Sequence, residues 1–127
     1  MRIGFWHFAF LGEESQWAAE ASECAGEQDA FWEYYDYLFA NQNGENQQAF
    51  TKDNLKAFAT ALKLDSEAFN TCLDSGKYTQ LVQNMTAAGR QIGVQSTPTF
   101  AINGQPVIGA QPFENFQQVI DGFLQGD

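Results

Sequence analysis

The sequence has few of the residues that build metal centres and nucleic-acid interfaces. Its 127 residues include two cysteines, one histidine and six lysines and arginines, against 16 aspartates and glutamates, so the formal net charge is −10. This excess of carboxylates argues against a nucleic-acid backbone or an anionic membrane surface as partner, because both are themselves polyanions. No run of about 18 apolar residues occurs, which excludes a transmembrane helix.

The glycines, cysteines and first residues also lack the spacing of three familiar motifs. The eleven glycines are scattered at the ends of expected elements and form no phosphate-binding loop, so we expect no cofactor. Cys24 and Cys72 are too far apart for a local Cys-x-x-Cys motif or a zinc knuckle, and we expect no metal. The segment Met1–Trp6 lacks the charged region, apolar region and cleavage site of a signal peptide.

The residues that follow Met1 have the pattern of a buried strand. From Arg2 to Leu11 the chain is rich in aromatic residues, and apolar side chains fall on both faces of an extended backbone. A strand with two apolar faces is typical of a sheet that is covered on both sides. We therefore expect residues 2–11 to form a strand with both faces buried.

A helical region is predicted next. Apolar residues recur there at three- and four-residue intervals, which is the spacing of amphipathic helices. The expected helices are about 13–25, about 28–40, one through Leu55 and Leu62, a short one through Phe69 and Leu73, and about 78–91. Thr51 is placed to cap the third helix, and Asp65 or Ser66 is placed to cap the fourth. Ser75-Gly76 should end the fourth helix.

The strand pattern returns after residue 94. Two apolar runs, Thr99–Ile102 and Gln105–Gly109, are separated by Asn103-Gly104, and such a pair is a strong short-range indication of a β-hairpin. A last amphipathic helix follows Pro112. The predicted order is strand, about five helices, strand, strand and helix, which makes an α/β fold, or α+β by its proportions.

Eight carboxylates lie between residues 13 and 36 with no lysine or arginine among them. They are Glu13, Glu14, Glu20, Glu23, Glu27, Asp29, Glu33 and Asp36. We interpret them as the solvated side of two helices, since they lie between the apolar positions. A metal or cationic partner is the alternative, although the set contains no Glu-x-x-His pair. His7, the only histidine, lies in an apolar segment, and we interpret it as a hydrogen-bonded structural residue.

Cys24 and Cys72 each fall on the apolar face of a predicted helix, so the two can meet inside a helical subdomain. They could be two buried free thiols, a redox-active pair or a structural disulfide. A fast redox switch needs an exposed thiol of low pKa, and neither cysteine lies at a helix N-terminus or beside a cation. We therefore favour the structural disulfide, which would contribute roughly 4 kcal/mol by closing a loop of this length.

The most specific motif in the chain is Val94–Gly104, with the letters V-Q-S-T-P-T-F-A-I-N-G. It resembles the G-V-x-x-T-P-T-F-x-I-N-G stretch of DsbA-like thiol-disulfide oxidoreductases in the thioredoxin superfamily. The segments around the two cysteines and Gly109–Phe113 resemble the same family, so the resemblance covers nearly the whole chain. It implies that Thr97 and Pro98 form a cis-proline loop that contacts the substrate backbone, although the sequence alone does not fix the isomer. Without the resemblance, Pro98 would read only as the start of an edge strand.

The resemblance also implies a disulfide between Cys24 and Cys72, and an incomplete thioredoxin-like fold. Complete members carry a strand, a Cys-x-x-Cys motif and a long helix before the position of Arg2, and this chain contains none of the three. Residues 1–12 and 94–127 would then form a thioredoxin-like remnant around a helical insertion, residues 13–93. Loss of an interior strand leaves backbone groups unpaired. We expect the first strand to pair directly with the hairpin, or a homodimer to complete the sheet.

Two functional hypotheses follow from the resemblance. In the first, the chain is a DsbA-like thiol-disulfide oxidoreductase that is inactive by itself because Cys-x-x-Cys is absent, with protein or peptide thiols and disulfides as partners. In the second, it is a non-catalytic peptide-binding or dimerisation module whose disulfide is only structural. A persistent disulfide and the family resemblance both favour an extracytoplasmic compartment, the periplasm or the cell surface.

Overall fold

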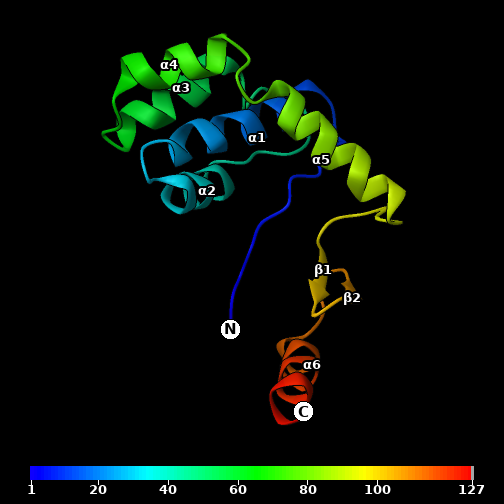
Figure 1. The fold of residues 1–127 in the computed structure, drawn as a ribbon. Helices are drawn as coiled ribbons and strands as arrows, with labels where there is room; N and C mark the ends of the chain where they lie inside the picture. The colour runs from blue at the N-terminus through cyan, green and yellow to red at the C-terminus, as the bar shows by residue number, and fades with distance from the viewer. Residues whose placement is uncertain (127) are drawn as a thin grey trace. The chain divides into compact units, whose positions relative to one another are not determined.

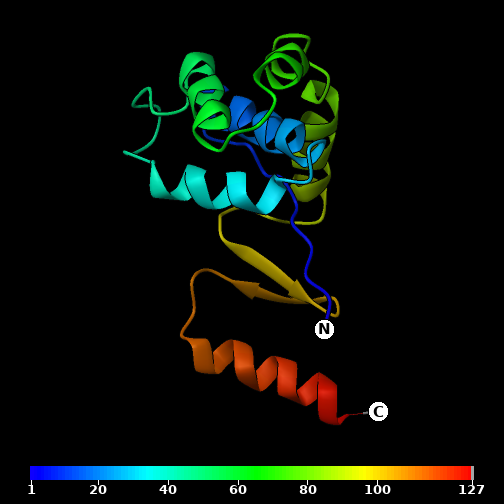
Figure 2. The same cartoon turned by 90° about the vertical axis from the view of Figure 1, so that its left-hand side faces the viewer.

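The computed structural model describes residues 1–126, which contain six helices and one two-stranded sheet (Figures 1 and 2). The helices are α1 (Glu13–Gly26), α2 (Phe31–Ala40), α3 (Lys52–Ala61), α4 (Ser66–Asp74), α5 (Thr79–Gln91) and α6 (Phe113–Gln125). The strands are β1 (Thr99–Ile102) and β2 (Gln105–Ile108). The chain divides into two compact units, Met1–Ala88 and Gly89–Asp127.

The strand predicted for residues 2–11 is not formed. Within residues 1–126 the sheet consists of β1 and β2 alone, and no backbone–backbone hydrogen bond joins residues 1–11 to another described segment. Ile3 and Trp6 are 72% and 57% exposed, so the expected burial of both faces is also wrong. The physical reason is the missing neighbour, because an extended segment becomes a strand only when a second strand satisfies its backbone groups.

Side chains attach this first segment to the helices instead. The Trp6 indole Nε1 donates a hydrogen bond to the Met85 carbonyl at 2.8 Å, and the Ala9 N–H donates to the Thr86 hydroxyl at 3.0 Å. The Phe5 ring packs edge-on against the Tyr35 ring, with their centroids 5.2 Å apart. The structure therefore groups residues 1–12 with the helices, whereas the sequence groups them with residues 94–127.

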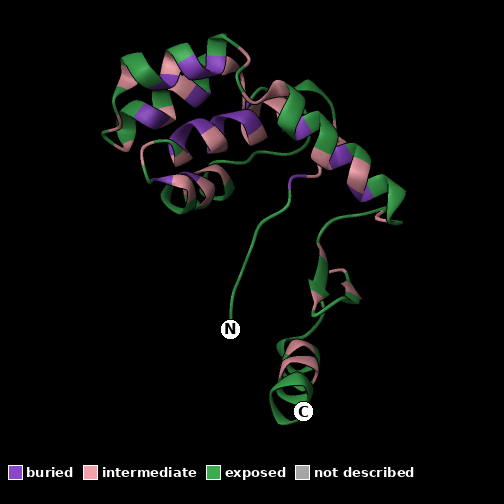
Figure 3. Ribbon diagram, viewed as in Figure 1, coloured by how far each residue is buried: buried purple, intermediate pink, exposed green. Residues whose placement is uncertain are grey.

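The first unit is built around a core between helices, and most of the residues in this core lie on α1, α3 and α4, with Tyr34 added from α2 (Figure 3). The largest fully buried side chains of this unit include Tyr34, Phe69, Leu55 and Leu73. The Tyr34 hydroxyl donates to the Leu55 carbonyl at 2.8 Å, and burial raises the pKa of this phenol. One polar bond thus fixes α2 against α3 inside an apolar core.

The ends of the helices follow the predicted local chemistry, with one difference. The Thr51 and Asp65 side chains accept hydrogen bonds from the N–H groups of Asn54 and Ala68, and so cap α3 and α4. In α2 the helix begins at Phe31 rather than near residue 28. Asp29 has a positive φ of 58°, which interrupts a right-handed helix at this point.

The second unit is the predicted hairpin followed by α6. Asn103 and Gly104 both have positive φ, 47° and 84°, as a two-residue hairpin turn of type I′ requires. Thr99 lies opposite Ile108 at one end of the antiparallel pair and Ile102 opposite Gln105 at the other. None of residues 90–126 is buried, so this part of the chain has no interior of its own.

Candidate functional site

Thr97 and Pro98 lie in the exposed loop that leads into β1. The peptide bond between them is cis. Two hydrogen bonds order the loop: the Gly109 N–H donates to the Pro98 carbonyl at 2.8 Å, and the Thr99 hydroxyl donates to the Ser96 carbonyl at 2.7 Å. The loop is therefore fixed on the side of β2, while the side chains of Thr97 and Pro98 face solvent.

The register of the hairpin determines which backbone groups of β1 are open. Because Gly109 bonds to Pro98, these two residues form a hydrogen-bonded pair, and such pairs alternate with non-bonded pairs along an antiparallel ladder. Thr99 and Ala101 therefore direct their N–H and C=O groups away from β2. No other described strand pairs with this edge, so the outward N–H and C=O groups of Thr99 and Ala101 have no strand partner within residues 1–126.

The outer edge of β2 is closed to the same kind of partner. Pro106 lies opposite Ala101, in a non-bonded pair, so its nitrogen faces outward. Proline has no N–H group to donate, and it protects an edge strand against pairing. Of the two edges of this hairpin, the β1 edge, next to Thr97 and Pro98, is the one without a proline among residues 99–102.

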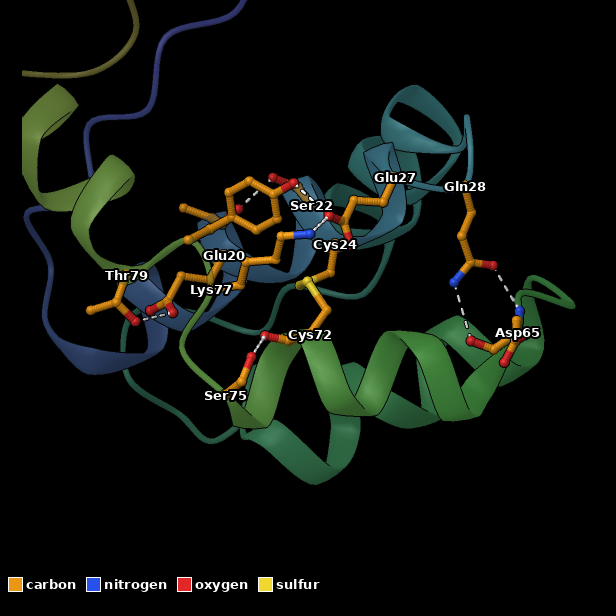
Figure 4. The surroundings of a disulfide bond; sticks show 12 residues. Glu20, Ser22, Cys24, Glu27, Gln28, Asp65, Cys72, Ser75, Lys77 and Thr79 are labelled. Atoms are coloured by element: carbon orange, nitrogen blue, oxygen red, sulfur yellow. Dashed lines mark hydrogen bonds and ion pairs between the residues drawn. A yellow bond between two sulfur atoms is a disulfide. The ribbon is translucent and has the colours of Figure 1, made fainter.

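Cys24 of α1 and Cys72 of α4 form a disulfide bond (Figure 4). Their Cα atoms are 5.8 Å apart, and the two residues are 1% and 5% exposed within the core of the first unit. The predicted disulfide is confirmed, and the reading as two free thiols is wrong. Since the chain has only these two cysteines, it holds no free thiol that could form a nucleophilic thiolate.

An ion pair lies beside the disulfide (Figure 4). Lys77 donates to the Glu27 carboxylate, and the Tyr78 hydroxyl donates to the same carboxylate at 2.9 Å. These bonds, above all that from Lys77, lower the pKa of Glu27, and the bond to Glu27 raises the pKa of Lys77. The positive charge of Lys77 is thus paired with the Glu27 carboxylate.

The interpretation of the eight carboxylates as a solvated surface is wrong for three of them. Glu20 is buried and accepts hydrogen bonds from the Thr79 hydroxyl and the Gln16 amide. Glu23 lies 2.8 Å from Nε2 of the buried His7, which agrees with a structural role for this histidine. Glu20 is four residues before Cys24, so it shares the apolar side of α1, and this spacing could have identified it.

Glu14 is the third carboxylate with an unexpected structural role. Its two oxygens accept hydrogen bonds from the N–H groups of Gln48 and Phe50, at 2.8 and 3.1 Å. The bonds hold the loop between α2 and α3 against the start of α1. Sequence reasoning missed this contact because the partners are more than thirty residues apart and are backbone groups.

Residues 1–126 contain no group of three or more histidine, cysteine, aspartate or glutamate side chains arranged to hold a metal ion. None of the described helices combines the length and the apolar composition that crossing a lipid bilayer requires.

The chain and its fold are similar to known proteins. A family model described as "Thioredoxin" matches residues 1–122, and the chain belongs to this family. A solved structure of a thioredoxin-like oxidoreductase from Silicibacter pomeroyi superposes with a TM-score of 0.76, covering 95% of this chain and 67% of that one, at 21% identity. The predicted thioredoxin-like fold is thereby confirmed.

Curated relatives are of two kinds. The chain is 27% identical to the probable disulfide bond formation protein D of Bacillus cereus, over 98% of this chain and 59% of that protein. It is 31% identical to the Na(+)/H(+) antiporter NhaA of Herminiimonas arsenicoxydans, over 86% of this chain and 17% of that protein. The chain is thus a DsbA-like member of the thioredoxin superfamily that spans only part of these relatives.

Proposed function

We propose that this chain provides the peptide-binding part of a DsbA-like thiol-disulfide oxidoreductase and does not itself catalyse exchange. One observation carries the second half of the proposal: both cysteines are bonded to each other within the core. Exchange requires attack by a thiolate on an accessible disulfide sulfur. Cys24 and Cys72 offer neither a thiolate nor an exposed sulfur, so their bond acts as a structural link between α1 and α4.

The peptide-binding half of the proposal rests on the hairpin. The open backbone groups of Thr99 and Ala101 lie next to the exposed Thr97–Pro98 loop, and a protein segment in extended conformation would pair with them. The partners would be proteins or peptides that carry thiols or disulfides, as the name of the Bacillus relatives suggests. The disulfide is consistent with an extracytoplasmic location, where such bonds persist.

A second candidate function is a non-catalytic peptide-binding or dimerisation module. The observation that favours it is the lack of any buried residue between positions 90 and 126. The hairpin packs on α6 through Phe100 and Phe116, but large apolar side chains of this unit such as Ile108 and Phe113 stay exposed. Association with a peptide, or with another copy of the chain, would cover them.

Binding at the β1 edge can be tested with a proline substitution. We expect an extended cysteine-containing peptide to shift the amide NMR signals of residues 97–101, with weaker effects on β2. The Ala101→Pro variant removes an outward N–H group and should weaken binding about tenfold or more. The matched Ala101→Val variant keeps this group and should bind about as well as the unaltered chain.

Two results would contradict binding at this edge. One is a set of signal shifts centred outside residues 97–101, and the other is equal affinity of the Ala101→Pro and Ala101→Val variants. In both cases the peptide would not pair with the β1 backbone. Circular dichroism of each variant checks that the helices remain formed.

A further inference from the structure

We propose that the surroundings of the Cys24–Cys72 disulfide select, by charge, the thiols that can reduce it in the folded chain. Neutral and cationic small thiols reach the bond, whereas anionic thiols are kept away from it. This selection is separate from peptide binding at β1, so either proposal can fail without the other. It explains how the bond between α1 and α4 persists beside thiols that would otherwise open it.

Cys72 is the bonded cysteine that lines an open hollow in the surface of the first unit. The hollow has a volume of about 440 Å³, which is large enough for a small thiol compound. Cys72 is 5% exposed, whereas Cys24 is 1% exposed. Thiol–disulfide exchange begins when a thiolate attacks one sulfur and the other sulfur leaves. A thiolate that enters the hollow is therefore directed to Cys72, with Cys24 as the leaving group.

The walls of this hollow carry more negative than positive charge. They include the carboxylates of Glu27, Asp65 and Glu67 and the ammonium group of Lys77. Lys77 is paired with Glu27, so these two charges offset each other (Figure 4). Asp65 and Glu67 are exposed, and neither forms an ion pair within residues 1–126. These two carboxylates repel a thiol compound that carries a negative charge besides that of its thiolate.

The positions of the two cysteines on their helices act in the same direction. Cys24 lies in the last turn of α1, and Cys72 lies in the last turn of α4. The C-terminal end of a helix carries a partial negative charge, which disfavours a thiolate there. Reactive cysteines are stabilised as thiolates in the opposite way, by a helix N-terminus or a cation. Both sulfurs are therefore poor leaving groups, and exchange is slow for every thiol.

The reduction that is selected in this way has two steps. First, an external thiolate attacks the Sγ atom of Cys72 and forms a mixed disulfide, while the Sγ atom of Cys24 leaves as a thiolate and takes a proton from water. Second, another external thiolate attacks the external sulfur of the mixed disulfide, and Cys72 leaves and is protonated in the same way. Two electrons pass from the two external thiols, which become a disulfide, to the protein. Both attacking thiolates approach through the hollow.

The test uses three thiols of similar size but different charge. Mercaptopropionate carries a carboxylate, mercaptoethanol a hydroxyl and cysteamine an ammonium group. Alkylation followed by mass spectrometry gives the rate at which each thiol reduces the folded chain. Each rate is divided by the rate at which the same thiol reduces a small neutral disulfide, bis(hydroxyethyl) disulfide, at the same pH. The normalised rate should rise in the order given, by about tenfold in all at low ionic strength, and salt should reduce this difference.

A substitution in the hollow separates its effect from that of the net charge of −10. Glu67→Gln should raise the ratio of the mercaptopropionate rate to the cysteamine rate about two- to fourfold, and Glu67→Lys should raise it further. The matched control is Glu45→Gln, which changes the net charge equally. Glu45 is exposed in the loop that Glu14 holds at the opposite end of α1 from Cys24, so this variant should leave the ratio nearly unchanged.

Three outcomes would overturn selection by the hollow. Equal normalised rates for the three thiols would show that charge has no effect. Equal changes of the ratio in Glu67→Gln and Glu45→Gln would show that the net charge, and not the hollow, repels anionic thiols. A reduction rate that does not depend on thiol concentration would mean that the bond reacts only after the chain unfolds. If Glu67→Gln fails to fold, Asp65→Asn, which keeps a capping side chain on α4, takes its place.

Discussion

Replacing Cys24 and Cys72 together by alanine is expected to lower the free energy of unfolding by about 4 kcal/mol. The bond links residues 48 positions apart, and breaking it lets the unfolded chain explore many more conformations. Such a loss is a large fraction of the stability of an ordinary domain. Urea unfolding followed by tryptophan fluorescence measures it, since Trp17 packs against the core around the disulfide.

Two controls separate the bond from the loss of two side chains. The unaltered chain in excess dithiothreitol should lose nearly the same free energy as the double variant, because its bond is broken while its sulfur atoms remain. The single Cys24→Ala variant should match them. A change below about 1 kcal/mol in the double variant would mean that the bond does not hold the helices together.

A second large effect is expected from Phe69, which is 0% exposed in the core of the first unit. Its ring lies 5.5 Å from that of Tyr34, measured between centroids, and it follows the Asp65 cap on α4. Phe69→Ala leaves a cavity among neighbours that cannot fully close it, and should cost about 3–5 kcal/mol. Urea unfolding measures this change in the unfolding free energy.

The matched control for this substitution is Phe39→Ala at the end of α2. Phe39 is 55% exposed, so the same truncation should cost less than about 1 kcal/mol. Equal losses at the two positions would show that the core is not centred on Phe69. If Phe69→Ala fails to fold, the milder Phe69→Leu variant, which keeps most of the apolar volume, takes its place in the comparison.

The parts of the fold that could be predicted are those fixed by neighbouring residues. Asn103-Gly104 adopts the two positive φ angles that few other residue pairs tolerate, and the hairpin follows from it. Thr51 and Asp65 cap their helices because their side chains reach N–H groups three residues ahead. These effects are local, because the residues that cause them lie within a few positions of one another in the sequence.

The strand expected at residues 2–11 shows what the pattern of a short segment cannot predict. Alternating apolar residues predict extended backbone but not the strand that must lie beside it. The carboxylates show the same limit, because Glu20 and Glu14 are satisfied by groups from α5 and from the loop before α3. The burial of Glu20 could have been predicted from its spacing to Cys24, but the long-range partners of Glu20 and Glu14 could not.

The candidate site was predicted in part. Cys24 and Cys72 could be paired because both fall on apolar helix faces, and the structure bonds them. Thr97 and Pro98 came from a family resemblance, and their role in binding stays a prediction. The register that places Pro106 opposite Ala101 follows from the two-residue turn, whereas the lack of a neighbouring strand beside β1 within the described residues could not be predicted.

Reduction of insulin in the presence of dithiothreitol tests the central claim most directly. Adding this chain should leave the rate at that of dithiothreitol alone, and the Cys24→Ala, Cys72→Ala double variant should behave identically. A rate clearly above this background that is lost in the double variant would contradict the account, since the Cys24–Cys72 bond would then be a working redox pair.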